Sequence, residues 1–177
     1  MANRHLDRVL RSDFLDGINE WPIEEIRERR AECQRLEDAA SYLRRLVQTR
    51  IDILGMEARS RSDGQLPDLE SLISQLPTIL SDGDGRSFGG RLLTAGLEET
   101  QELWAEARVA EACVGHDVEN SPELEDSVIA LMADNLAALE REVSAERRRL
   151  HDIFDALQAE LVRRYRSGLA SVDGLLT

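Results

Sequence analysis

The sequence predicts an all-α protein built on two long helices, and three observations support this fold class. Gly55 is the only helix-weakening residue between Pro22 and Ser62, and no Gly or Pro occurs between Pro122 and Gly168. Both stretches carry apolar residues at every seventh position, which is typical of helices that pack along a narrow seam. Aromatic residues make up only 4% of the chain, which does not suit the thick core of a sheet protein.

The chain is expected to enter the first long helix through a short helix or turn and a loop at Gly17. The first long helix is predicted over residues 22–62. Pro22 suits its first turn, where a missing N–H does no harm. Glu24 and Glu25 follow at the positive end of the helix dipole, which favours a helix start here.

Residues 63–120 are interpreted as an acidic connecting segment with short helices. Its pattern predicts helices over 66–80 and 97–113, separated by a Gly-rich loop over 81–90. Residues 63–139 hold three Arg against sixteen acidic residues, so this part of the chain accounts for the whole net charge of −13. Such a segment is either a solvated linker or an acidic surface for a basic protein partner.

The second long helix is predicted over residues 121–167, with Ser121 as its N-cap, Pro122 in its first turn and Glu123 as an early acid. A helix of this length, polar outside one apolar stripe, needs a partner helix. We predict that the partner is the first long helix, folded back to form an antiparallel coiled-coil hairpin. The alternative is a homodimer.

The seven-residue repeat defines the seam of this coiled coil. Position a holds Ile26, Cys33, Ala40, Val47 and Leu54 in the first helix and Ile129, Leu136, Val143, Leu150 and Leu157 in the second. Position d holds Leu36 and Leu43, then Met132, Leu139 and Ile153. Polar residues occupy the remaining d positions and are expected to weaken the seam without abolishing it; they are Arg29, Arg50, Glu146 and Glu160.

Several classes of function are disfavoured. No long uncharged apolar run is present and the N-terminus lacks the apolar core of a signal peptide, so we predict a cytoplasmic protein without a membrane span. Two cysteines make no disulfide framework and suggest no zinc site, and the acidic net charge argues against duplex DNA as a direct partner. Nucleophile–base motifs, phosphate-cradling loops and metal clusters are missing, so we do not expect an enzyme. The length of 177 residues suits a single domain over residues 1–177.

A polar motif with the spacing Glu-x3-Ser-x2-Arg-x3-(Gln/His)-x3-Asp occurs once on each long helix. Its two copies are Glu37, Ser41, Arg44, Gln48 and Asp52, and Glu140, Ser144, Arg147, His151 and Asp155. The heptad phase also matches, with Glu and Arg at e, Ser and Gln/His at b and Asp at f. Polar residues at these positions ordinarily form a solvated face with intrahelical ion pairs. Two copies with the same residue types, order and phase instead indicate a repeated binding stripe.

The motif suits a guanine nucleotide with phosphates better than a metal ion or a sugar. An arginine can donate two parallel hydrogen bonds to the O6/N7 edge of guanine or to a phosphate. A carboxylate can accept hydrogen bonds from the guanine N1–H and exocyclic amine, and Ser or Gln can contact phosphate or ribose. Antiparallel helices would relate the two copies by a pseudo-twofold axis, so a twofold-symmetric ligand is expected.

This duplicated motif on paired helices resembles the signature of the RsiG family of actinobacterial anti-sigma factors. The resemblance implies that the ten motif residues bind cyclic di-GMP as a dimer of the dinucleotide, with no other cofactor. It also implies that the loaded protein holds a WhiG-type sigma factor of the sporulation programme away from RNA polymerase. The first copy matches all five positions of the signature, whereas the second has His151 in place of Gln.

Two functions of different classes therefore stand beside each other. Ligand-gated sequestration of a sigma factor is favoured, and one chain per complex is expected because one chain carries both motif copies. The alternative is a structural coiled-coil adaptor whose motifs bind no nucleotide. Titration with cyclic di-GMP separates the two.

Overall fold

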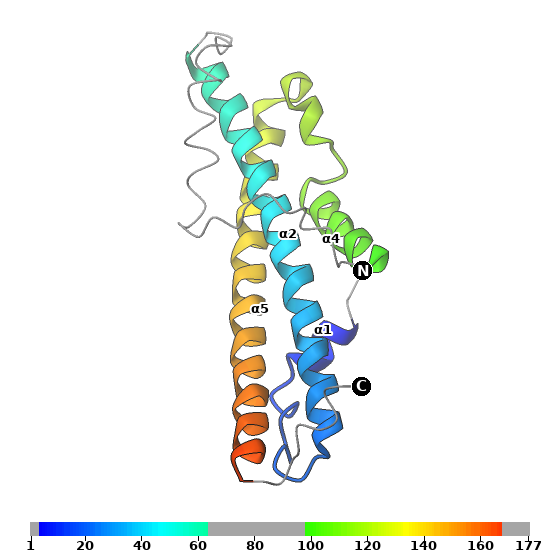
Figure 1. The fold of residues 1–177 in the computed structure, drawn as a ribbon. Helices are drawn as coiled ribbons and strands as arrows, with labels where there is room; N and C mark the ends of the chain where they lie inside the picture. Colours follow the sequence, from blue (N-terminus) through cyan, green and yellow to red (C-terminus); the bar gives the residue numbers. More distant parts are fainter. Residues whose placement is uncertain (1–3, 64–97, 168–177) are drawn as a thin grey trace.

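The computed structural model describes residues 4–63 and 98–167, and within them the regular structure is all helical (Figure 1). The helices follow one another as α1 (Arg4–Val9), α2 (Ile23–Asp63), α4 (Glu99–Ala112), the 3-10 helix η1 (Val118–Glu123) and α5 (Asp126–Arg166). The all-α prediction is confirmed for this part of the chain. The helix predicted over 66–80 and the loop over 81–90 lie outside the described residues. No described helix is both long and apolar enough to span a bilayer.

The scaffold consists of α2 and α5, each 41 residues long, which run in opposite directions side by side (Figure 1). Hydrogen bonds mark this direction at both ends and in the middle, joining Arg30 to Gln158, Arg44 to Glu140 and Arg61 to Asp126. Residue numbers fall along α5 as they rise along α2, so the two helices are antiparallel. The bounds of α2 differ by one residue at each end from the predicted 22–62.

The prediction for the start of the second long helix is wrong. Ser121 is not an N-cap, because residues Val118–Glu123 form η1 and α5 begins only at Asp126. Arg61 of α2 donates hydrogen bonds to the backbone carbonyls of Ser121 and Pro122, at 2.8 and 3.1 Å. Ser121, Pro122 and Glu123 thus form the end of a 3-10 helix that a tertiary contact holds in place, and the α-helix starts after it.

The predicted seam forms the core between the two helices. All ten residues assigned to position a are buried, as are four of the five apolar d residues; only Ile153 is partly buried. Full burial of one leucine or isoleucine side chain contributes roughly 1.5–3 kcal/mol to folding before entropy costs. The continuous seam is therefore the main source of stability for a helix pair of this length.

Polar residues at the d positions lie where further segments pack on the helix pair. Near the start of α2, Arg29 lies 3.8 Å from the centroid of the Trp21 ring and donates to the backbone carbonyl of Phe14. On α5, Glu160 accepts a hydrogen bond from Arg164, which also donates to the carbonyl of Trp21. The N-terminal segment is thus fastened to both long helices by polar contacts.

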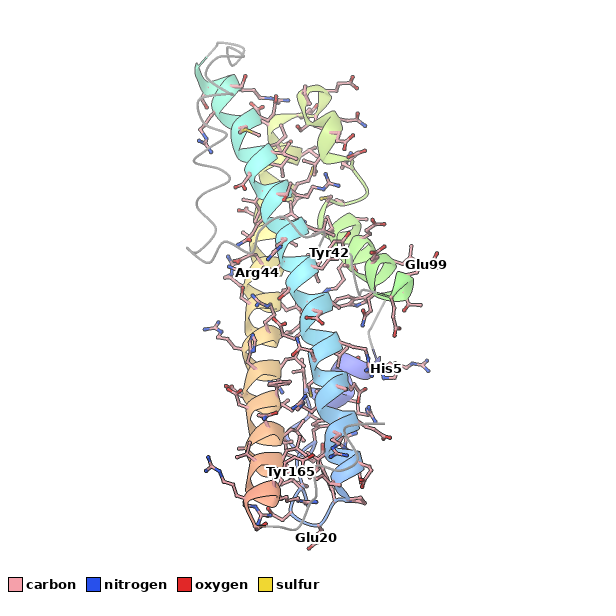
Figure 2. The ribbon with its side chains drawn as sticks, viewed as in Figure 1. His5, Glu20, Tyr42, Arg44, Glu99 and Tyr165 are labelled. Carbon is pink, nitrogen blue, oxygen red and sulfur yellow. The ribbon has the colours of Figure 1, made fainter. Side chains whose placement is uncertain are left out.

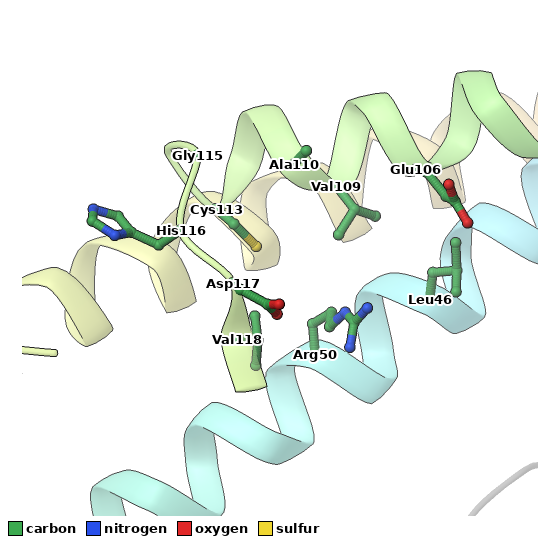
Figure 3. A pocket seen from close by; sticks show the side chains of 10 residues that line it. All are labelled: Leu46, Arg50, Glu106, Val109, Ala110, Cys113, Gly115, His116, Asp117 and Val118. Atoms are coloured by element: carbon green, nitrogen blue, oxygen red, sulfur yellow. The ribbon is translucent and has the colours of Figure 1, made fainter. Parts of the chain in front are cut away.

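The other two polar d residues face α4 and the turn that follows it. Arg108 of α4 forms ion pairs with Glu142, at 2.9 Å, and with Glu146, at 3.1 Å. Arg50 lines an open pocket of about 430 Å³ between α2, α4, the turn that follows α4 and the start of η1 (Figure 3). An unpaired charge is costly to bury between two helices. These two positions therefore favour the packing of α4 against the helix pair.

Acid is expected to destabilise the junction between the N-terminal segment and α5. A hydrogen bond from Arg163, opposed by burial and assisted by Arg164, lowers the pKa of Glu160 to about 2. A carboxyl whose pKa is depressed on folding contributes stability that is complete above about pH 4.3 and is lost as the pH falls towards 2. Glu160→Gln should therefore melt earlier than wild type at pH 7, with a shallower decline of the melting midpoint between pH 5 and pH 2.

Circular dichroism melts at several pH values measure this effect, and the exposed Glu28 provides a matched control on α2. Glu28→Gln should follow the wild-type curve. A Glu160→Gln protein with the wild-type dependence on pH would show that this carboxylate does not stabilise the junction.

The helices α1 and α4 both contact the same side of the α2–α5 pair. Arg8 of α1 pairs with Glu32, and Arg108 of α4 pairs with Glu142; both glutamates occupy position g of the heptad. Tyr42 lies on the side of α2 towards α4, whereas Arg44 lies on the other side and bonds Glu140 of α5 (Figure 2). The motif residues at e, b and f therefore lie on the side of the pair opposite to the contacts with α1 and α4.

Candidate ligand-binding site

The two motif copies meet reciprocally across the helix pair. Arg44 of α2 donates from Nε to Oε1 of Glu140, at 3.1 Å. Arg147 of α5 donates from Nε and Nη2 to Oε1 of Glu37, at 3.1 and 2.8 Å. The arginine of each copy thus pairs with the glutamate of the other, as a pseudo-twofold axis between antiparallel helices requires.

Within each copy the serine holds the glutamate four residues earlier on the same helix. Ser41 Oγ donates to Glu37 Oε1 at 2.7 Å, and Ser144 Oγ donates to Glu140 Oε1 at 3.3 Å. A spacing of four residues places both side chains on one face of a helix, which permits this bond. Each half-site is therefore a cluster of one carboxylate, one hydroxyl and one guanidinium from two helices.

Glu37 is the more tightly held of the two carboxylates. Burial alone would raise its pKa, but hydrogen bonds from Ser41 and Arg147 outweigh that effect, and the pKa lies below its ordinary value. Its side chain is 15% exposed, compared with 27% for Glu140. The Glu37 carboxylate is consequently ionised at neutral pH and anchored in a fixed orientation.

The outer members of the two copies differ in their contacts. His151 Nε2 lies 3.4 Å from Glu37 Oε1, so the histidine joins the first cluster. Among the described residues, the structure records no hydrogen bond or ion pair for Gln48, Asp52 or Asp155. Each aspartate lies two helical turns beyond the arginine of its copy, about 12 Å along the axis, so the two aspartates lie at opposite ends of the face.

The arginines of the two copies are paired with glutamates and not with each other. Arg44 and Arg147 each lie against a glutamate of the opposite helix, at 3.1 and 2.8 Å. Antiparallel alignment places the arginine of each copy opposite the glutamate of the other, so the charges of the two copies neutralise each other. On the face formed by the ten motif residues, which we call the motif face, these ion pairs join α2 to α5.

Arg44 presents exposed hydrogen-bond donors on this face. The Arg44 side chain is 36% exposed, and only its Nε takes part in a recorded bond among the described residues. A guanidinium has five N–H donors, so those on the two terminal nitrogens of Arg44 can address a phosphate or the guanine O6/N7 edge. The described residues include no group of His, Cys, Asp or Glu that could hold a metal ion.

One end of the face contains a cluster that the motif does not include. Arg30 lies with its guanidinium carbon 5.5 Å from the centroid of the Phe154 ring and hydrogen-bonds to Gln158. Arg30 and Phe154 both occupy position e, in the heptad beyond Glu37 and Arg147 respectively. Extending the e positions by one heptad in the sequence would have identified both residues.

Fold and site together define a helical protein with a duplicated, self-complementary polar site between two antiparallel helices. Residues 12–80 match the model of a family described as RsiG-like. This match spans less than half of the 177 residues and contains the first motif copy, while the second copy lies outside it. Over this stretch, the family resemblance predicted from the motif is confirmed. Neither a curated protein nor a solved structure matches the chain.

The family match bears on the class of function. The RsiG-like family is a regulatory family of anti-sigma factors and not a family of enzymes. The match over residues 12–80 supports the class of function that is proposed below.

Proposed function

We propose that this protein is an anti-sigma factor that binds cyclic di-GMP on the motif face and, when loaded, sequesters a WhiG-type sigma factor to repress sporulation genes. The ligand is taken up as two cyclic dinucleotides by the ten motif residues of α2 and α5. One chain suffices, because both motif copies lie on it and pair with each other.

The observation that carries the proposal is the reciprocal pairing of Arg44 with Glu140 and of Arg147 with Glu37. It produces two similar clusters about a pseudo-twofold axis, and cyclic di-GMP has two identical halves. Each cluster offers a guanidinium for phosphate or the guanine O6/N7 edge, and a carboxylate for the guanine N1–H and amine. A solvated helix face would have no need for such matched clusters.

An acidic surface on the other side of the helix pair supports a basic protein partner. Glu99, Glu106 and Glu111 are exposed on α4. The single arginine of α4, Arg108, is occupied by two glutamates of α5. Complementary charge raises association rates and suppresses wrong partners, which is what sequestration of one sigma factor requires.

Calorimetric titration of the full chain with cyclic di-GMP tests the proposed ligand. We expect saturable binding with two dinucleotides per chain, and little binding of the linear dinucleotide, because the linear form lacks the twofold closure of the ring. Purified sigma factor is then added to the loaded chain, and light scattering gives the mass of the complex. One copy of each protein is the expected composition.

The alternative function, a coiled-coil adaptor without a nucleotide ligand, is supported by the same ion pairs, since they join the two helices. Under that interpretation, cyclic di-GMP releases no heat on titration and does not change sigma-factor binding. A complex that contains two copies of this chain would instead show that the site forms between chains.

A further inference from the structure

The two ends of the motif face are chemically different, although the motif itself is repeated. One end holds three residues in contact with each other or with the facing helix: Arg30, Phe154 and Gln158. At the positions related to them by the repeat, the other end has Ala133, Ile51 and Gly55. The first end therefore has a cation and an aromatic ring. The equivalent positions at the second end hold only apolar residues or glycine.

His151 adds to this difference. It lies at the same end as Arg30 and Phe154, and its Nε2 is 3.4 Å from Glu37 Oε1. Its equivalent in the other copy is Gln48, a side chain that cannot carry a charge. With His151 protonated, the first end has three cations, Arg30, Arg147 and His151, whereas the corresponding positions of the second end have one, Arg44.

We propose that the end formed by Arg30, Phe154, Arg147 and His151 is the high-affinity subsite of the motif face for a purine nucleotide phosphate, and that protonation of His151 strengthens this subsite. The inference rests on the proposed nucleotide-binding function and assigns the order in which its two halves fill. Phe154 and the Arg30 guanidinium provide a surface for a base, since bases stack on aromatic rings and guanidinium planes. His151 is the affinity-determining residue.

Charged groups around His151 determine the direction of the pH effect. Glu37 of α2 contacts it, and Arg30 lies on the same face of α2 two turns earlier. On α5, Arg147 precedes His151 by one turn and Asp155 follows by one turn. Histidine is the side chain that ordinarily changes its charge between pH 5 and 8. A phosphate placed here adds negative charge, so binding should take up a proton and affinity should rise as the pH falls.

The test is calorimetric titration with cyclic di-GMP at about pH 8 and about pH 6, in buffers of different ionisation enthalpy, which also gives the number of protons taken up. Wild-type affinity should rise about three- to tenfold over this range, as expected for one partly screened charge. His151→Gln reproduces the first motif copy and should remove both the rise and the proton uptake. Arg30→Ala should lower affinity by a similar factor, while the exposed Arg35→Ala should not.

A second probe separates this inference from the proposed ligand. GMP has one guanine and one phosphate and can fill a single subsite. If GMP binds with the expected dependence on pH and on His151 while cyclic di-GMP does not bind, the subsite stands and the proposed ligand is wrong. If cyclic di-GMP binds equally well to wild type, His151→Gln and Arg30→Ala at both pH values, the proposed ligand stands and the subsite is wrong. Failure of both nucleotides to bind overturns both.

Discussion

Replacing Arg44 or Arg147 by alanine is expected to weaken cyclic di-GMP binding by about tenfold to more than a hundredfold. Each change removes a charge-assisted contact to a phosphate or guanine edge, with a cost of about 1.5–3 kcal/mol. Both variants should keep their helicity in circular dichroism, because the seam beneath them stays intact. Arg147→Ala should also lower the melting midpoint more than Arg44→Ala, since Arg147 makes two bonds to Glu37 and Arg44 makes one to Glu140.

Neighbouring arginines provide matched controls for this prediction. Arg45 and Arg148 are exposed, and each directly follows the arginine of its motif copy. Arg45→Ala and Arg148→Ala remove the same charge from the same part of the helix and should leave the affinity within about twofold, because exposed charges are strongly screened. Wild-type affinity in both Arg44→Ala and Arg147→Ala would exclude the motif face as the binding site.

A charge swap distinguishes a ligand site from a helix clamp. In the double variant Glu37→Arg with Arg147→Glu, the ion pair between α2 and α5 can form with its partners exchanged. Stability should then recover towards the wild-type value, while cyclic di-GMP binding should stay weak because the guanidinium and carboxylate have changed places. Recovery of both stability and binding would mean that only the ion pair matters.

Cyclic di-GMP is expected to raise affinity for the sigma factor by roughly five- to more than a hundredfold, and the sigma factor should raise affinity for the nucleotide by the same factor. This range corresponds to couplings of about 1–3 kcal/mol, and reciprocity follows from thermodynamic linkage. The nucleotide does not act by neutralising unpaired arginines, because Arg44 and Arg147 already pair with glutamates. The nucleotide must instead exchange these partners or present its own surface to the sigma factor.

Sigma-factor binding measured at increasing concentrations of cyclic di-GMP tests the coupling, with the linear dinucleotide as control. The helix content of the chain should change little on loading, because the buried seam and the ion pairs already hold α2 against α5. Equal sigma-factor affinity with and without cyclic di-GMP would leave an anti-sigma factor that the ligand does not gate. A large gain in helicity on loading would show that the ligand assembles the helix pair.

The sequence by itself determined the two long helices, the residues of their seam and the repeated motif. These features depend on local properties: the scarcity of Gly and Pro, the seven-residue spacing of apolar side chains and the order of polar residues along one helix. Local signals were less informative at Ser121, where Ser-Pro-Glu is compatible with either an α-helix or a 3-10 turn. There Arg61, sixty residues earlier in the chain, bonds the carbonyl of Ser121 and favours the turn.

Only the tertiary structure decided how charges pair across the helices. The spacing of the motif along one helix does not show which group its arginine faces on the other helix. The antiparallel alignment sets each arginine against the glutamate of the other copy. The partners of the polar d residues were likewise not visible in the sequence. Only the structure shows that Arg108 of α4 forms an ion pair with Glu146. The free energy of a charge depends on which groups surround it in space, and spacing along a single helix carries no information about groups brought by another.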